Sequence, residues 1–326
     1  MKKRIVILAT GGTISAAGEE GATTGYTDGE FDVNTLISGI PNIERLAELS
    51  GEQILNVSSA DITTDDWILL ANRINTLAER GEADGFVITH GTDTLEETAY
   101  FLNLFVKTRK PVVITGAMRP ATATSADGPL NLYQAVALAA SDKSVGKGVM
   151  AVFADAVFGG RDVQKVNNFR ADAFSCRDFG CMGYMRNDDV YFINESVKKH
   201  TADTEFDLSL VESLPKVAVA YFHAGADSGV LEYLKDHADG LVIAGAGGSA
   251  FSQEWLETVS RISKEIPVVR STRVANGITI YDAAVDLKGG TIYSVTLPPQ
   301  KSKVLLTAAL TKTRDRKEIQ RMFEEY

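Results

Sequence analysis

The chain has 326 residues, of which 44% are hydrophobic and 23% charged, and its formal net charge is -10 at pH 7. This length suits one large domain or two of ordinary size, and the composition is that of a globular protein. The acidic excess disfavours nucleic acid or an anionic membrane as the main partner. No apolar run approaches the roughly 18 residues that a membrane-spanning helix needs.

The chain begins with a basic cluster, Lys2–Arg4, and a short apolar run, Ile5–Ala9. This run is shorter than the roughly 7–15 residues of a signal-peptide core, and it continues directly into a glycine-containing motif. We therefore expect a cytoplasmic protein, or a periplasmic or secreted one from which a signal peptide has been removed.

Short apolar runs alternate with helical patterns along the chain. The runs that predict buried strands are Arg4–Leu8, Gly85–Thr89, Pro111–Thr115, Gly148–Phe153, Val217–Phe222, Gly240–Ala244 and Ile266–Val269. Strands that alternate with helices form right-handed βαβ units and a parallel sheet. The pattern predicts an α/β protein, with a larger N-terminal domain built on a mainly parallel sheet flanked by helices and a smaller C-terminal α/β domain.

Helical periodicity is clearest over Thr64–Arg80, where apolar residues recur on one face behind a threonine N-cap. Thr94–Lys107 and Gly128–Ala140 show similar patterns. Ser302–Tyr326 predicts two helices that are broken near residues 313–315.

A polar stretch without a strand pattern separates two series of strands and helices. It predicts a linker at 194–214, between an N-terminal catalytic α/β domain at 1–193 and a C-terminal α/β domain at 215–326.

Two threonine-bearing motifs each follow a predicted strand. Ala9–Ile14 follows the first strand, and Thr89–Thr94 follows the next predicted strand about eighty residues later. Ligands of open α/β sheets bind at the carboxyl ends of the strands, so both motifs deliver a threonine to that edge. Two threonines, an adjacent aspartate and glycines that admit a substrate to the backbone indicate a nucleophilic site.

These features also have structural explanations. A Gly-Gly pair permits a strand-to-loop turn, and Asp93 at a helix N-terminus can simply cap that helix. Residues 17–30 hold four glycines, which is typical of a lid and equally of an ordinary surface loop. Gly245–Ala250 fits a dinucleotide-binding pattern only loosely and is better explained as a tight turn between a strand and a helix.

Metal and conventional serine-hydrolase sites are not indicated. The histidines show no metal-binding spacing, and no serine elbow motif is present. Cys176 and Cys181 cannot form a structural zinc site by themselves. They are either free thiols or a local disulfide, and a disulfide would favour an oxidising compartment.

Taken together, these segments resemble the bacterial-type L-asparaginase/glutaminase family over essentially the whole chain. The runs that carry the resemblance are Thr10–Ile14, His90–Thr94, Gly116–Pro120, Ser125–Pro129, Arg161–Lys165 and Leu306–Thr311. The first two runs are specific as a pair. Gly116–Asn131 points to the type II branch, whereas Ser58–Trp67 has some type I character.

The resemblance implies a two-domain α/β amidohydrolase that converts L-asparagine to L-aspartate and ammonia, with side activity on L-glutamine. It implies no cofactor and no metal. It also implies a homotetramer, a dimer of dimers, in which each site lies between the large domain of one subunit and the small domain of another. The remaining partner is a small-molecule substrate, and neither nucleic acid nor a membrane is expected.

By this resemblance, Thr13 is the nucleophile that attacks the side-chain amide carbon and forms an acyl-enzyme. Tyr26, in the glycine-rich loop, closes over the site and polarises that hydroxyl. Thr92 orients or activates the water for deacylation, and Lys165 serves as the base.

The same resemblance assigns the substrate contacts. Asp93 belongs to the catalytic group and also binds the substrate ammonium, and Ser59 receives the α-carboxylate. The Thr92 backbone N–H helps to hold the oxyanion. Ala117 offers its carbonyl oxygen to the leaving ammonia.

The chain departs from the family pattern at three places around the substrate amine. Ala60 stands where the family usually has Gln, and Ala284 stands where a neighbouring subunit usually supplies Glu. An Asn or Ser near Gly248–Ala250 usually supports that Glu, so Ser249 is shifted by one position or the role is empty. A hydrogen bond to a charged group contributes about 1.5–3 kcal/mol, so these changes predict binding weakened by roughly ten- to several hundred-fold.

Three alternatives to an ordinary asparaginase therefore stay open. The first is a weakly active relative, and the second is a relative retuned for another amide. The third is a non-catalytic amino-acid-binding protein on the same scaffold. An amidotransferase subunit that supplies ammonia to a partner is disfavoured, because such relatives usually carry an extra N-terminal segment.

Overall fold

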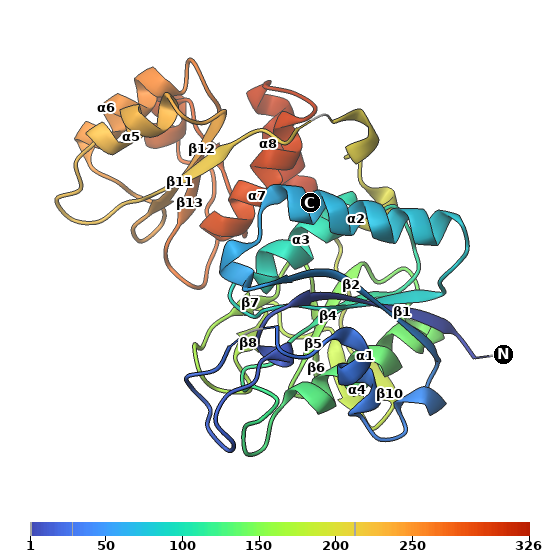
Figure 1. The fold of residues 1–326 in the computed structure, drawn as a ribbon. Helices are drawn as coiled ribbons and strands as arrows, with labels where there is room; N and C mark the ends of the chain where they lie inside the picture. The colour runs from blue at the N-terminus through green and yellow to red at the C-terminus, as the bar shows by residue number, and fades with distance from the viewer. Residues whose placement is uncertain (1, 28, 212) are drawn as a thin grey trace. The chain divides into compact units, whose positions relative to one another are not determined.

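The computed structural model describes residues 2–27, 29–211 and 213–326; Met1, Asp28 of the glycine-rich loop and Glu212 lie outside the described residues. The chain divides into two compact units, Met1–Thr204 and Glu205–Tyr326. The division lies within 194–214, the stretch predicted to be a linker. In Figure 1 the first unit is coloured from blue through green to yellow, and the second unit from yellow to red.

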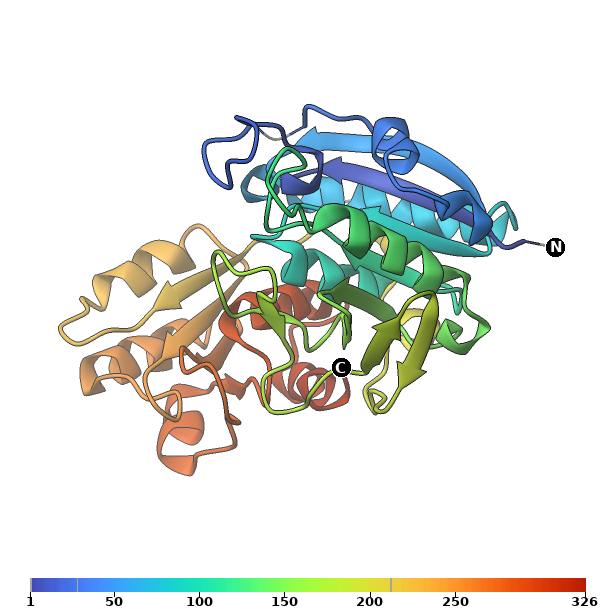
Figure 2. The ribbon, with the colours of Figure 1, turned by 90° about the horizontal axis from the view of Figure 1, so that it is seen from below.

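The first unit is built on an eight-stranded sheet with the order β10-β9-β6-β5-β4-β3-β1-β2. Its parallel strands are β1 (Arg4–Gly11), β2 (Glu48–Val57), β3 (Gly85–Thr89), β4 (Val112–Thr115) and β5 (Val149–Phe153). Every residue of β3, β4 and β5 is buried, as a parallel sheet covered on both faces requires. Figure 2 shows β1 and β2 side by side at one edge.

Helices cover both faces of this sheet (Figure 1). On one face lie α2 (Thr64–Glu79) and α3 (Leu95–Phe105), and on the other lie α1 (Val33–Ser38) and α4 (Gly128–Ala140). Side chains alternate between the faces of a strand, so Ile5 and Ile7 join the core beneath α4. The prediction of an α/β unit with a mainly parallel sheet is confirmed.

The predicted helix over Thr64–Arg80 is present as α2, and its start has a local cause. The Thr63 hydroxyl accepts the Asp66 N–H at 3.4 Å, while the Asp66 carboxylate accepts the Thr63 N–H at 2.8 Å. This reciprocal capping box satisfies two N–H groups that a helix end otherwise leaves without partners. The predicted helix over Gly128–Ala140 is found with the same bounds as α4.

Several strands were not predicted. β2 is an edge strand whose half-exposed polar residues break the apolar pattern. The antiparallel strands β6 (Ala156–Gly159), β9 (Gly183–Arg186) and β10 (Asp189–Phe192) are too short to give a clear period. A separate pair, β7 (Gln164–Lys165) and β8 (Phe174–Ser175), lies outside the main sheet.

The second unit has a parallel sheet with the order β11-β12-β13-β14. Its strands are β11 (Val217–Tyr221), β12 (Gly240–Gly245), β13 (Val268–Thr272) and β14 (Ile292–Tyr293). The first two match the predicted runs closely, and β13 continues three residues beyond its predicted run. The smaller C-terminal α/β domain is thereby confirmed as a fold.

In the described part of this unit, four α-helices accompany the smaller sheet. They are α5 (Gly229–Lys235), α6 (Gln253–Ile262), α7 (Pro299–Leu310) and α8 (Arg316–Glu325). α5 and α6 supply Leu231 and Trp255 to a core with Ile243 of β12. The break between α7 and α8 includes residues 313–315, as predicted.

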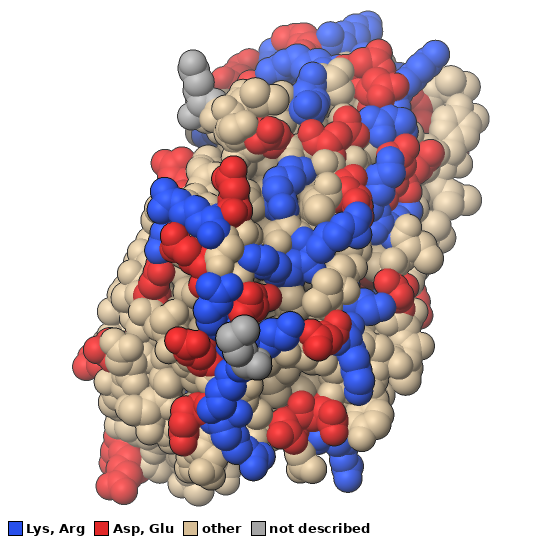
Figure 3. Space-filling model, turned by 90° about the vertical axis from the view of Figure 1, so that its right-hand side faces the viewer, with Lys and Arg blue, Asp and Glu red and all other residues tan. Residues whose placement is uncertain are grey.

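Charge is finely mixed on the face drawn in Figure 3, where Lys and Arg stand among Asp and Glu. The net charge of -10 therefore does not gather into one acidic area on that face. Among the described residues, no helix has the length and apolar character needed to span a membrane.

Candidate functional site

The two threonine motifs lie at the ends of neighbouring strands. β1 and β3 are paired in parallel, with Ala9 opposite Thr89, so the segments that follow them leave the sheet together. The strand order β2-β1-β3-β4-β5 changes direction between β1 and β3. Such a switch point is where doubly wound sheets bind their ligands.

Glycines allow these segments to approach more closely than side chains would permit. A Cβ added to Gly12 would lie 2.3 Å from the Gly91 Cα, and one added to Gly91 would lie 2.7 Å from the Ser59 Oγ. A Cβ on Gly116 would lie 2.3 Å from the His90 carbonyl oxygen. Gly12 and Gly116 are therefore required by contact with backbone atoms, and Gly91 by contact with the Ser59 side chain, beyond the turn that Gly-Gly permits.

Thr13 begins a short 3-10 helix immediately after Gly12, whose φ is 81°. Its side chain is nearly buried, and its Oγ1 lies 3.3 Å from the Tyr26 hydroxyl oxygen. Either hydroxyl can donate in this contact. The structure thus brings together Thr13 and Tyr26, which the resemblance paired.

The glycine-rich loop that carries Tyr26 is held at two places. At its base, the Ala17 N–H donates to the Thr27 carbonyl at 3.1 Å and the Thr27 N–H donates back at 2.9 Å. Further along, the Gly21 N–H donates to the Thr122 carbonyl at 2.9 Å. These contacts fold the loop back so that Tyr26 meets Thr13.

A second cluster joins Lys165 to the other motif. The Lys165 Nζ donates to the Thr92 Oγ1 at 2.8 Å and forms an ion pair with the Asp93 Oδ1 at 2.6 Å. Asp93 is therefore engaged by a cation. The N-cap of α3 is Thr94, so the alternative explanation of Asp93 as the cap of this helix does not apply.

Glu96 is a buried residue of this cluster that sequence reasoning missed. Its carboxylate accepts the Lys165 backbone N–H at 2.8 Å and so links α3 to the two-residue strand β7. The signal available in the sequence was an acidic residue in the first turn of α3 that lies on the buried side.

The remaining predicted residues lie close by. Ser59 is buried; its Oγ accepts the Asp93 N–H at 3.2 Å, and its carbonyl accepts the Thr94 hydroxyl at 2.7 Å. Ala117 is buried just beyond β4, next to Gly116, whose carbonyl accepts the Asn131 Nδ2 at 3.0 Å. All of the predicted site residues thus come from the first unit.

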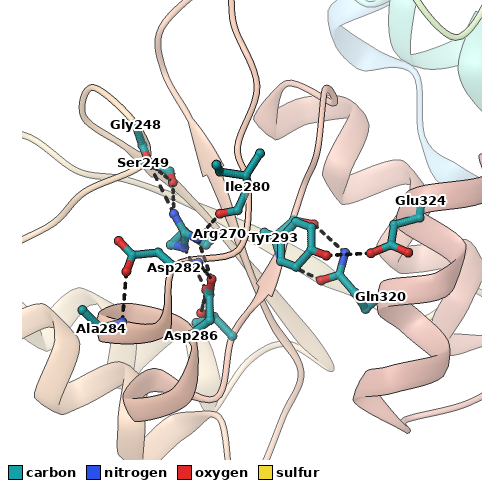
Figure 4. A network of polar contacts seen from close by, with 11 residues as sticks. Gly248, Ser249, Arg270, Ile280, Asp282, Ala284, Asp286, Tyr293, Gln320 and Glu324 are labelled. Carbon is teal, nitrogen blue, oxygen red and sulfur yellow. Dashed lines mark hydrogen bonds and ion pairs between the residues drawn. The ribbon is translucent and has the colours of Figure 1, made fainter.

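The second unit contains two of the positions where the chain departs from the family pattern (Figure 4). Ala284 lies on a short π-helix, Ala283–Leu287, and its N–H donates to the Asp282 Oδ1 at 2.9 Å. Ala60, in the first unit, is exposed. Neither alanine offers a polar side chain to a ligand.

Ser249 does not face outward as a replacement for the missing polar group. It is fully buried, and its hydroxyl is bound by the Arg270 guanidinium. Arg270 also binds both oxygens of Asp286, at 2.9 and 2.7 Å, and the Ile280 carbonyl at 2.8 Å. The Ser249 side chain therefore lies in the interior of its own unit, hydrogen-bonded to Arg270 (Figure 4).

Neither cysteine belongs to the two clusters described above. Cys176 and Cys181 do not form a disulfide with each other, and Cys176 is buried. Within residues 2–27, 29–211 and 213–326, no three His, Cys, Asp or Glu side chains are grouped so as to hold a metal ion.

Two family models match the chain and together cover most of it. The model described as "Asparaginase, N-terminal" matches residues 4–198. The model described as "Glutaminase/Asparaginase C-terminal domain" matches residues 216–323.

Named proteins match over nearly the full length. L-asparaginase 2 of Escherichia coli (strain K12) is 45% identical over 325 residues, which cover 99% of this chain and 93% of that protein. A glutaminase-asparaginase of Pseudomonas fluorescens biotype A is 41% identical, covering 99% and 90%. The crystal structure of a probable cytoplasmic L-asparaginase from Campylobacter jejuni is 45% identical, covers all of both chains and superposes with a TM-score of 0.96.

Proposed function

The chain belongs to the asparaginase family, in its type II branch, and we infer that it hydrolyses L-asparagine to L-aspartate and ammonia, with side activity on L-glutamine. The observation that carries the assignment to particular residues is the pair of clusters at the switch point. Thr13 contacts Tyr26, and Lys165 contacts both Thr92 and Asp93.

Thr13 is the nucleophile. Its Oγ1 attacks the side-chain amide carbon of asparagine, the C–N bond breaks, and ammonia leaves with a proton from the enzyme. The Tyr26 hydroxyl, 3.3 Å away, polarises the attacking oxygen. The product of this half-reaction is an ester between Thr13 and the substrate acyl group.

The second cluster serves hydrolysis of that ester. The Thr92 hydroxyl orients the attacking water, and Lys165 moves the proton through its contact with the Thr92 Oγ1 at 2.8 Å. Asp93 holds the Lys165 ammonium between these steps. Water gives up a proton as it adds to the acyl carbon, the bond to Thr13 breaks, a proton returns to the Thr13 Oγ1, and L-aspartate is released.

Substrate contacts surround these groups. Asp93 binds the substrate ammonium, Ser59 binds the α-carboxylate, and the Ala117 carbonyl accepts a hydrogen bond from the leaving ammonia. The Thr92 N–H holds the oxyanion. In the described part of the chain this N–H donates to no other protein group, so it is available.

We further propose a homotetramer, a dimer of dimers, with a small-molecule substrate as the other partner. The proposed compartment is the cytoplasm, or the periplasm or cell exterior if a signal peptide has been removed. The name of the Campylobacter jejuni relative and the lack of a disulfide between Cys176 and Cys181 favour the cytoplasm, whereas a 45% identical relative from Haemophilus influenzae is named a probable periplasmic L-asparaginase.

The test is ammonia release from L-asparagine, D-asparagine and L-glutamine, from micromolar to tens of millimolar. We expect saturable turnover of L-asparagine that Thr13→Ala and Thr92→Val abolish. Thr258→Val, which removes a buried hydroxyl in the second unit, should leave turnover intact. A folded protein that binds L-aspartate but turns over no amide would overturn the enzyme in favour of an amino-acid-binding protein.

A further inference from the structure

A buried chain of polar groups ends at the second motif and has no part in the mechanism above. The Trp67 Nε1 donates to the Thr98 Oγ1 at 2.8 Å. The Thr98 Oγ1 lies 2.9 Å from the His90 Nε2, and the His90 Nδ1 lies 2.7 Å from the Gly91 carbonyl oxygen. His90 and Thr98 are fully buried.

The chemistry of the end groups fixes the direction of every hydrogen bond. A carbonyl oxygen only accepts, so the His90 Nδ1 carries a hydrogen. An indole N–H only donates, so Thr98 accepts from Trp67 and has its own hydrogen to give. Burial lowers the pKa of His90 to about 4, so the ring is neutral at pH 7 and its Nε2 accepts from Thr98.

The Gly91 carbonyl, which accepts from the His90 Nδ1, belongs to the peptide group that joins Gly91 to Thr92. In a planar trans peptide the C=O and N–H point in opposite directions, so holding the Gly91 carbonyl also fixes the Thr92 N–H. A hydrogen bond to the carbonyl also strengthens the N–H as a donor, by about 10–30%.

We propose that Trp67, Thr98 and His90 form a relay that orients and polarises the Gly91–Thr92 peptide. His90 is then a positioning residue for the oxyanion, and it acts through the Thr92 N–H. This inference rests on the proposed function, because it takes the Thr92 N–H as the oxyanion donor.

The first test compares Thr98→Val, which removes the relay hydroxyl, with Thr98→Ser, which keeps it. We expect Thr98→Val to lower kcat on L-asparagine about three- to thirtyfold, less than the roughly 10²–10³ lost with a whole oxyanion donor. KM should stay within about twofold of wild type, because the relay contacts no substrate group. Thr98→Ser should restore most of kcat, and Thr258→Val controls for the loss of a buried hydroxyl.

The second test determines the tautomer of His90 and does not depend on catalysis. ¹⁵N NMR of histidine-labelled protein, with the signal identified by its loss in His90→Gln, should show the Nδ1–H tautomer at neutral pH. An Nε2–H tautomer, or equal kcat for Thr98→Val and Thr98→Ser, would overturn the relay. If the wild type turns over no amide, the proposed function fails with the oxyanion role, while the NMR result still decides the direction of the relay.

Discussion

In the proposed site, two alanines stand where the family resemblance places polar partners of the substrate amine. Ala60 and Ala284 replace the Gln and Glu that the family resemblance places there, and Ser249 is bound internally by Arg270. The proposed site therefore keeps its groups for chemistry and the substrate contacts of Asp93 and Ser59, and it lacks two further polar partners for the substrate amine. A shortage of this kind raises KM more than it lowers kcat.

Restoring the two side chains should tighten substrate binding. We expect Ala60→Gln with Ala284→Glu to lower KM for L-asparagine by about ten- to a hundredfold, since a hydrogen bond to a charged group contributes about 1.5–3 kcal/mol. Steady-state kinetics measure this, and kcat should change little. Ala283→Glu adds the same charge one position earlier on the π-helix. An equal gain from that control would attribute the effect to charge alone.

At the level of elements, a helix or strand was predicted where its local sequence pattern was clear and was missed where it was not. α2 was found because its N-cap, acidic first turn and apolar face agree, and β3 and β4 were found because both faces are buried. β2 was missed because only part of an edge strand is buried. The strand β7, which positions Lys165, has two residues and therefore no period that a sequence pattern could reveal.

The candidate site was predicted in a different way. Its residue types were recognised from motifs, and the pairing of β1 with β3 explains why Thr13 and Thr92 share one edge. The Lys165 side chain contacts Asp93 and its backbone N–H contacts Glu96, and these partners lie 72 and 69 positions away, which no local pattern encodes. The inward orientation of the Ser249 side chain likewise depends on Arg270, a buried residue of β13.

That arginine should be a principal source of stability in the second unit. Arg270 and Asp286 form an ion pair whose side chains are each 2% exposed, and Arg270 also ties together Ser249 and Ile280. We expect Arg270→Met to lower the free energy of unfolding of this unit by about 3–5 kcal/mol, because it leaves a buried carboxylate without its cation.

Urea unfolding followed by tryptophan fluorescence measures this loss, since Trp255 lies in the core of the same unit. Arg261→Met, which removes a more exposed ion pair with Glu232, is the matched control and should cost about 1 kcal/mol or less. Equal losses of unfolding free energy for the two variants would show that the buried Arg270–Asp286 pair contributes no more than an exposed pair.

At the scale of the whole molecule, the proposed tetramer gives a direct prediction. Sedimentation velocity at micromolar concentration should give a mass of four times the 35.1 kDa of one chain. Dilution should reveal dimers before monomers, because a dimer of dimers has two kinds of interface. A single 35.1 kDa species at every concentration would contradict this assembly.

The contact between Gly12 and Gly91 also bears on how the protein acquires activity as it folds. The two residues are 79 positions apart, and their backbones meet only when β1 and β3 are paired in register. Contacts of high sequence separation form slowly, because a long loop must close before they are made. Helix content can return early in refolding, but Thr13, the proposed nucleophile, faces the second motif only after β1 and β3 have paired. Recovery of turnover should therefore mark completion of the sheet.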